Sequence, residues 1–167
     1  KWNVLTRDYE PLISLNYDVG TDLQTLTFEE DGTYTIRIWG VDDGVGAYSF
    51  QIWTVPDIET LELSLPDDAA DGVIGVGQGE IETPGVQDHY PLQVTAGQSL
   101  YFDGLESPYP IKWNIYNEAD EPLVSLNYDV GTDLEMITFP ETGLYTIRIW
   151  GNDDGIGAYQ FEIREQE

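Results

Sequence analysis

Apolar and polar residues alternate over several short stretches of the chain, which is the pattern of half-buried β-strands. In residues 145–150, for example, Tyr145, Ile147 and Ile149 fall on one side of the chain. The stretches are separated by residues that favour turns, at positions 117–122, 129–133, 140–143 and 152–157. No stretch has helical periodicity. The spacing therefore predicts an all-β fold, an antiparallel β-sandwich of jelly-roll-like topology.

Two further alternating stretches, at 90–94 and 99–102, flank the residues Ala96-Gly97-Gln98. A turn centred on glycine between two such stretches predicts a β-hairpin. Trp2 and Trp113 each lie inside an alternating stretch, and we predict that both are core residues.

The chain contains an internal repeat. Residues 1–52 align without a gap with residues 112–163, at a constant offset of 111 positions, and 35 of the 52 pairs are identical. The sequence PLISLNYDVGTDL in the first stretch corresponds to PLVSLNYDVGTDL in the second. Identity of this extent indicates a tandem repeat with a 111-residue period.

The repeat divides the chain unequally. Residues 57–167 form one full copy, whereas residues 1–56 correspond only to its C-terminal half. Half a sandwich exposes apolar side chains and unpaired strand edges, so we expect residues 1–56 to be completed by another segment or chain. The alternatives are exchange between molecules, which would propagate a filament, a permuted pairing with residues 57–111, and a smaller first sandwich. Lys1 begins inside a strand-like stretch without an initiator Met, so we expect an excerpt of a longer protein.

Four ordered segments of the full copy resemble the bacterial pre-peptidase C-terminal (PPC) domain, the jelly-roll class that includes collagenase collagen-binding modules. They are GEIETPGVQDHY at 79–90, VTAGQSLYF at 94–102, IKWNIY at 111–116, and TGLYTIRIWG at 142–151 followed by GAYQF at 157–161. The resemblance implies a non-catalytic β-sandwich that tolerates or binds calcium, appended to secreted enzymes or arrayed in surface proteins. It also implies a metal-binding set of Asp67, Asp68 and Asp88.

The charge is strongly acidic, with 32 Asp and Glu against 6 Lys and Arg, a net charge of −26. Such a surface repels nucleic acids and anionic lipid headgroups. Salt and divalent cations screen this self-repulsion, which favours an extracellular or cell-surface location. The chain has no cysteine, and a secreted protein without disulfides is more typical of bacteria. No apolar stretch is long enough to span a bilayer, so no membrane insertion is expected.

Catalytic motifs are absent from the sequence, and we predict that the protein is not an enzyme. The only histidine is His89, between Asp88 and Tyr90. The alternation places His89 on the opposite side of its strand from Tyr90, so we expect it to face solvent.

Calcium is the cofactor that the acidic turns favour, because it binds several carboxylate oxygens held close together. Three loops have that composition, and their acidic residues are Asp42 with Asp43, Asp153 with Asp154, and Asp129 with Asp133. The alternative is that these aspartates serve only turn geometry, through side-chain hydrogen bonds and left-handed backbone conformations.

Trp39 and Trp150 occupy matching positions on the polar side of their strands, so both should be partly exposed. They could stack on sugar rings or peptides, or they could pack against neighbouring copies. Arg37 and Arg148 lie on the same side of these strands, two positions before Trp39 and Trp150. We expect both arginines to neutralise nearby carboxylates.

Two functions remain open. The first is a structural or adhesive repeat of an acidic extracellular bacterial surface or matrix protein, whose partners are copies of itself or neighbouring repeats. The second is an accessory module of a secreted hydrolase that binds polysaccharide or an extracellular protein.

Overall fold

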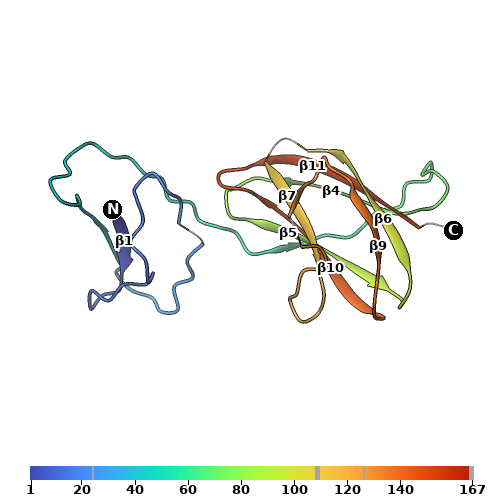
Figure 1. Cartoon of the computed structure of the whole chain (residues 1–167), viewed down its shortest axis with the longest axis horizontal. Helices are drawn as coiled ribbons and strands as arrows, with labels where there is room; N and C mark the ends of the chain where they lie inside the picture. The colour runs from blue at the N-terminus through green and yellow to red at the C-terminus, as the bar shows by residue number, and fades with distance from the viewer. Residues whose placement is uncertain (24, 108–109, 126, 166–167) are drawn as a thin grey trace. The chain divides into compact units, whose positions relative to one another are not determined.

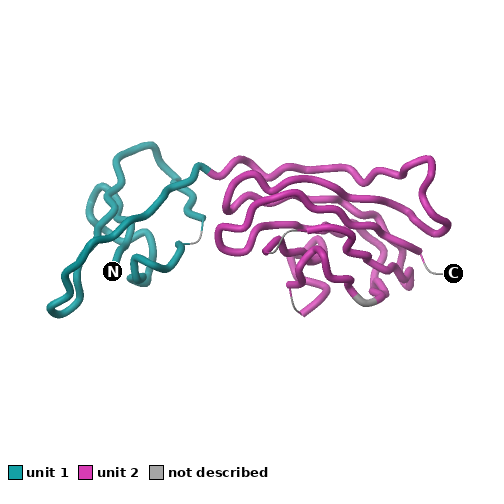
Figure 2. Tube along the Cα trace, turned by 90° about the horizontal axis from the view of Figure 1, so that it is seen from above, with its two compact units in different colours: residues 1–54 teal, residues 55–167 magenta. Residues whose placement is uncertain are grey.

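The computed structural model describes residues 1–23, 25–107, 110–125 and 127–165, and the chain forms two compact units. Unit 1 is Lys1–Thr54 and unit 2 is Val55–Glu167 (Figure 2). Every regular element in the described ranges is a β-strand, so the predicted all-β class is confirmed. The boundary lies two residues before the division expected after residue 56.

Unit 2 is a sandwich of two β-sheets (Figure 1). The five-stranded sheet has the order β3 (Glu59–Thr60), β5 (Gln87–Val94), β10 (Gly143–Gly151), β7 (Ile111–Tyr116), β8 (Tyr128–Asp129). The four-stranded sheet has the order β4 (Val73–Ile81), β11 (Gly157–Glu165), β6 (Ser99–Glu106), β9 (Leu134–Thr138). All neighbouring strands are antiparallel except β3 and β5.

The core lies between these sheets and follows the alternation of the sequence. Tyr145, Ile147 and Ile149 of β10 are all buried, as the pattern predicts. Trp113 of β7 is fully buried, and its ring lies 5.3 Å from that of Phe161 on the opposite sheet. Burial of large aromatic side chains contributes the dominant stabilisation of such a sandwich.

The prediction that residues 90–94 and 99–102 pair with each other as a β-hairpin is wrong. The turn forms, since the amide of Gln98 donates to the carbonyl oxygen of Thr95 and Gly97 has a φ of 83°. However, β5 pairs with β10, whereas β6 pairs with β11 and β9 in the other sheet. The turn therefore crosses between sheets, because both strands find partners in the C-terminal half of the repeat.

Unit 1 contains a two-stranded sheet of β1 (Trp2–Leu5) and β2 (Thr35–Ile38). Its register, with Trp2 opposite Ile38, equals that of β7 and β10, where Trp113 is opposite Ile149. Trp2, like Trp113, is buried as predicted. The repeated sequence therefore forms the same strand pair in both units.

The buried asparagine of this strand pair also makes the same contacts in both units. Asn3 Nδ2 donates to Asn16 Oδ1 at 2.9 Å, and Asn114 Nδ2 donates to Asn127 Oδ1 at 2.8 Å. In each case the side-chain oxygen accepts the amide hydrogen of the next residue. These contacts attach the loop that follows the strand to the strand itself.

Candidate functional site

The outward side chains of β5, β10 and β7 make up a surface that we call the outer face. Residues directly opposite one another on neighbouring strands share a side of the sheet. The register places three rows on this side: Gln87–Trp150–Lys112, His89–Arg148–Asn114 and Pro91–Thr146–Tyr116. The outer face therefore combines two aromatic side chains with two of the scarce cations of an acidic chain.

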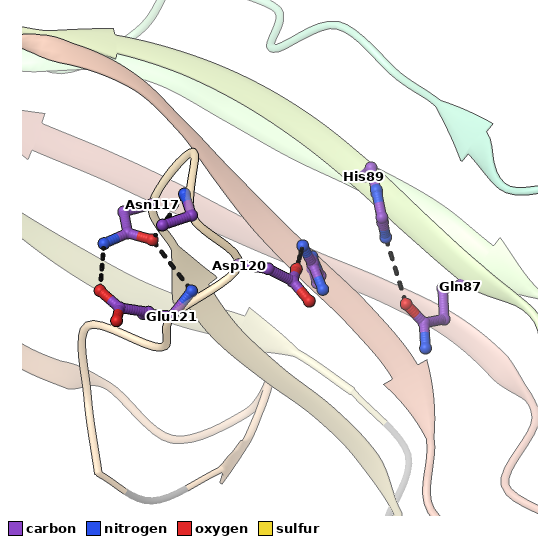
Figure 3. A network of polar contacts seen from close by, with 7 residues as sticks. Gln87, His89, Asn117, Asp120 and Glu121 are labelled. Atoms are coloured by element: carbon purple, nitrogen blue, oxygen red, sulfur yellow. Dashed lines mark hydrogen bonds and ion pairs between the residues drawn. The ribbon is translucent and has the colours of Figure 1, made fainter.

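Arg148 is held in a defined position on the outer face. Its guanidinium carbon lies 4.0 Å from the centroid of the Tyr116 ring, and it forms an ion pair with Asp120. Asp120 belongs to the loop after β7 and has a φ of 64°. The side chain of Asn117 accepts the amide hydrogen of Glu121, which closes that loop (Figure 3). The expectation that Arg148 neutralises a carboxylate is confirmed.

His89 lies on the outer face, the side that the alternation predicted, but it is half-buried and not fully open to solvent as expected. Its Nε2 is 3.2 Å from Gln87 Oε1 (Figure 3). The pKa of His89 is lowered, first by burial and then by the positive charge of Arg148. His89 is therefore neutral at neutral pH, and it serves as a polar side chain beside the row that contains Trp150.

Trp150 is half-buried, between Gln87 on β5 and Lys112 on β7. Lys112 Nζ also lies 2.9 Å from Asp129 Oδ1. An aromatic ring flanked by an amide and a cation is suited to contact with a polar ligand that has an apolar side. The outer face is the candidate ligand-binding site of unit 2.

The corresponding residues of unit 1 reproduce only part of this surface. Trp39 is half-buried, and the guanidinium carbon of Arg37 lies 5.1 Å from its ring centroid. Lys1 Nζ lies 3.0 Å from Asp18 Oδ2, as Lys112 pairs with Asp129 in unit 2. Tyr9 replaces Asp120 at the position that pairs with the arginine.

A buried chain of hydroxyl groups connects the two sheets of unit 2. The Tyr159 hydroxyl donates to Asp88 Oδ2 at 2.6 Å and lies 2.9 Å from the Tyr90 hydroxyl, which donates to the carbonyl oxygen of Gln78. Asp88 is 1% exposed, and its Oδ1 has no hydrogen-bond partner among the described residues. The sequence alone did not identify this series of hydrogen bonds, because the alternation predicts burial of positions 88 and 90 but not their contacts with residue 159.

Burial shifts the acidity of every group in this chain. The pKa of the Asp88 carboxyl is raised, chiefly by desolvation, and the nearby charges of Glu59 and Glu82 act in the same direction. Burial raises the pKa of Tyr90 to about 12 and also raises that of Tyr159. Both tyrosines are therefore neutral hydrogen-bond donors at neutral pH, while the Asp88 carboxylate is the destabilised member of the chain.

We expect Asp88→Asn to stabilise unit 2 at pH 7, since it removes a buried charge and keeps an oxygen for Tyr159. A carboxyl group whose pKa is raised by folding stabilises the folded state at pH values below its unfolded pKa. This stabilisation is lost as the pH rises through the folded pKa. The gain should therefore vanish below about pH 4. Thermal unfolding in EDTA from pH 3 to 7 measures it, with the exposed turn variant Asp153→Asn as control. A lower melting temperature for Asp88→Asn at pH 7 would contradict the expectation.

The acidic loops that contain Asp42 with Asp43 and Asp153 with Asp154 form tight turns. Asp42 and Asp153 have φ values of 52° and 54°, and the amides of Gly44 and Gly155 donate to the carbonyl oxygens of residues 41 and 152. A Cβ on Gly151 would lie 1.8 Å from the oxygen of Gly155, so the turn requires glycine there. Turn geometry thus accounts for Gly-x-Asp-Asp-Gly without a metal.

The other predicted metal ligands are held apart by their partners. Asp129 pairs with Lys112 in the five-stranded sheet. Asp133 accepts hydrogen bonds from the Tyr101 hydroxyl and the Gly104 amide, both in the four-stranded sheet. Two residues of the last predicted set, Asp67 and Asp68, are exposed, whereas Asp88 is buried.

No group of three or more acidic or histidine side chains in the described residues is close enough to hold one metal ion. Calcium binding by this chain stays a prediction.

Unit 2 is thus a two-layer antiparallel β-sandwich with a polar–aromatic outer face. No family model and no curated protein match this chain. Among solved structures, it is similar to PliG of Aeromonas hydrophila, a periplasmic inhibitor of g-type lysozyme, with 16% identity and a TM-score of 0.51. That match covers 65% of this chain and 97% of the other.

Two further solved structures align with the same share of this chain, 65%. One is PliG of Salmonella Typhimurium, with 15% identity, coverage of 99% of its own length and a TM-score of 0.45. The other is the pre-peptidase C-terminal domain of a Bacillus anthracis collagenase, with 16% identity, coverage of 95% of its own length and a TM-score of 0.43. The first similarity, to PliG of Aeromonas hydrophila, supports the sandwich fold of unit 2. In the described part of the chain there is no helix with the length and apolar character needed to cross a membrane.

Proposed function

We propose that this chain is part of a non-catalytic structural and adhesive repeat of an acidic extracellular bacterial surface or matrix protein. The observation that supports this proposal most directly is the reuse of one structural unit. Strand register, the buried asparagine contacts and the Lys–Asp ion pair are the same in units 1 and 2. An array in which every unit has the same role needs this kind of repetition.

The location outside the cytoplasm rests on two considerations. A net charge of −26 is easier to tolerate where salt and divalent cations screen it. One solved structure of similar fold, PliG of Aeromonas hydrophila, is that of a periplasmic inhibitor of g-type lysozyme. A location outside the cytoplasm is in keeping with both considerations. The similarity to an inhibitor also supports a binding role without catalysis.

Chains with one, two and three consecutive copies of residues 57–167 test the structural role. We expect each added copy to increase the maximum dimension by the same increment in small-angle X-ray scattering, with an unchanged melting temperature. The acidic copies repel one another, so the increments should be larger at low ionic strength. If the three-copy chain formed one compact particle, the structural role as an extended array would be refuted.

The outer face favours a second candidate function, an accessory module that binds polysaccharide or peptide. We expect Trp150→Ala to weaken glycan or peptide binding at least tenfold, about 1.4 kcal/mol, because the central ring of the outer face is lost. Glycan and peptide arrays followed by titration calorimetry measure this. Trp39→Ala is the matched control, because the described strands of unit 1 are β1 and β2 and include no counterpart of β5, so its loss should have little effect. Equal binding by all three proteins would exclude the outer face as the site, and the absence of binding by the unchanged protein would exclude this function.

A further inference from the structure

Unit 1 exposes the side chains that form the core of unit 2. Tyr48, Phe50 and Ile52 are 60%, 42% and 68% exposed, and Phe28 is 50% exposed. Their counterparts at the offset of 111 are at most 2% exposed, namely Tyr159, Phe161, Ile163 and Phe139. Large apolar side chains that are exposed together commonly mark an interaction site.

The N-terminal half of the repeat covers these side chains in unit 2. The ring of Phe161 lies against Gly77 of β4, where a Cβ would be 2.1 Å from the ring, and its centroid is 5.2 Å from that of Tyr90. Tyr159 lies against Gly79 and donates its hydrogen bond to Asp88. The glycines leave room for the two aromatic rings.

The strand content of unit 1 shows the same dependence on the N-terminal half. The strands that pair within the C-terminal half, β7 and β10, have counterparts in β1 and β2. The residues that correspond to β11, positions 46–54, form no strand. In unit 2, β11 pairs only with β4 and β6, and both belong to the N-terminal half. Residues 46–54 thus lack the partners that their sequence fits.

We infer that the exposed apolar side chains of unit 1, Phe28, Tyr48, Phe50 and Ile52, are the docking surface for a segment of the same kind as residues 57–111, supplied by another copy of the repeat in the same polypeptide. The inference rests on the proposed repeat function and names the partner of one unit. Tyr48 and Phe50 are identical to Tyr159 and Phe161. The glycines, Tyr90 and Asp88 that receive those two rings in unit 2 therefore fit unit 1 as well.

A second copy of the chain is the less favourable source of this segment. The 57–111 segment of that copy already covers its own C-terminal half, so an exchange exposes as much apolar surface as it buries. Two chains with a net charge of −26 also repel each other. A segment in the same polypeptide has a high effective concentration and does not uncover the C-terminal half of a second molecule.

The full chain with an additional copy of residues 57–111 joined to Lys1 tests the inference. We expect the amides of residues 46–52 to exchange with deuterium at least a hundred times more slowly than in the unextended chain. Binding of the dye ANS, which reports exposed apolar surface, should fall. The matched control carries Gly77→Val in the added copy only, where the new side chain takes the space of the Phe50 ring. That control should exchange and bind ANS like the unextended chain.

Unchanged exchange at residues 46–52 in the extended chain would overturn the inference, as would equal protection in the Gly77→Val control. Sedimentation velocity of the unextended chain tests the second-copy source. A dimer in which residues 46–52 are already protected would overturn the source in the same polypeptide. The scattering experiment on residues 57–167 contains no unit 1, so the failure of the proposed function is distinguishable from the failure of this inference.

Discussion

Replacement of Phe161 by alanine should lower the free energy of unfolding of unit 2 by about 3–5 kcal/mol. Phe161 is fully buried and lies between Gly77, Tyr90 and Trp113, so its removal leaves a cavity that joins both sheets. The surrounding rings cannot close this cavity without moving β4 and β7. Urea denaturation, followed by exchange of the β10 and β11 amides, measures the loss in unit 2 itself.

Phe50→Ala is the matched control for Phe161→Ala. The two residues occupy the same position of the repeat, but Phe50 is 42% exposed and contacts Trp2 at a ring separation of 5.7 Å. We therefore expect its replacement to change the stability of either unit by less than about 1 kcal/mol. A loss for Phe50→Ala as large as that for Phe161→Ala would show that Phe50 is buried in solution.

The second large effect is expected for Asn114→Leu. The Asn114 amide donates to the carbonyl oxygen of Val124 at 3.1 Å and to Asn127 Oδ1, and its oxygen accepts the amide hydrogen of Ile115. Leucine removes the partner of the buried Ile115 amide and of the partly buried Val124 carbonyl oxygen, so we expect unit 2 to lose about 2–3 kcal/mol. Urea denaturation measures the loss, and exchange of the amides at 123–125 should report loosening of the loop.

Asn127→Ala serves as the control for Asn114→Leu. Asn127 is exposed and provides only one of the contacts of Asn114. Water can replace that contact at the surface, so the loss should be less than about 1 kcal/mol. If both variants lose the same stability, the loop is held by groups other than the buried Asn114 amide.

The strands and the core of unit 2 were largely predictable from local pattern. Alternation at 145–150 placed Tyr145, Ile147 and Ile149 inside, and the structure buries all three. Burial on one side of a strand leaves a mark every second residue, so no knowledge of the partner strand is needed. The side of the sheet on which His89 and Trp150 lie followed from the same rule.

Pairing and side-chain contacts were less accessible. The turn at 95–98 was identified, but its two strands join different sheets, since partners far along the chain compete with the local one. The Asp88–Tyr159 contact joins residues 71 positions apart. Asp129 and Asp133 are near in sequence, yet their side chains bond to different sheets. Spacing along a chain does not encode which distant groups a side chain meets.

The amino-acid sequence by itself determined the β class and the buried side of each strand, because these depend on the order of apolar and polar residues, and it contains the similarity between residues 1–52 and 112–163. The tertiary structure decided which repeated residues become strand and core. Tyr48–Ile52 and Tyr159–Ile163 are nearly the same sequence, yet only the second forms a buried strand. A β-strand is stable only when its backbone groups and its apolar side find partners, and β4 and β6 supply those partners to Tyr159–Ile163.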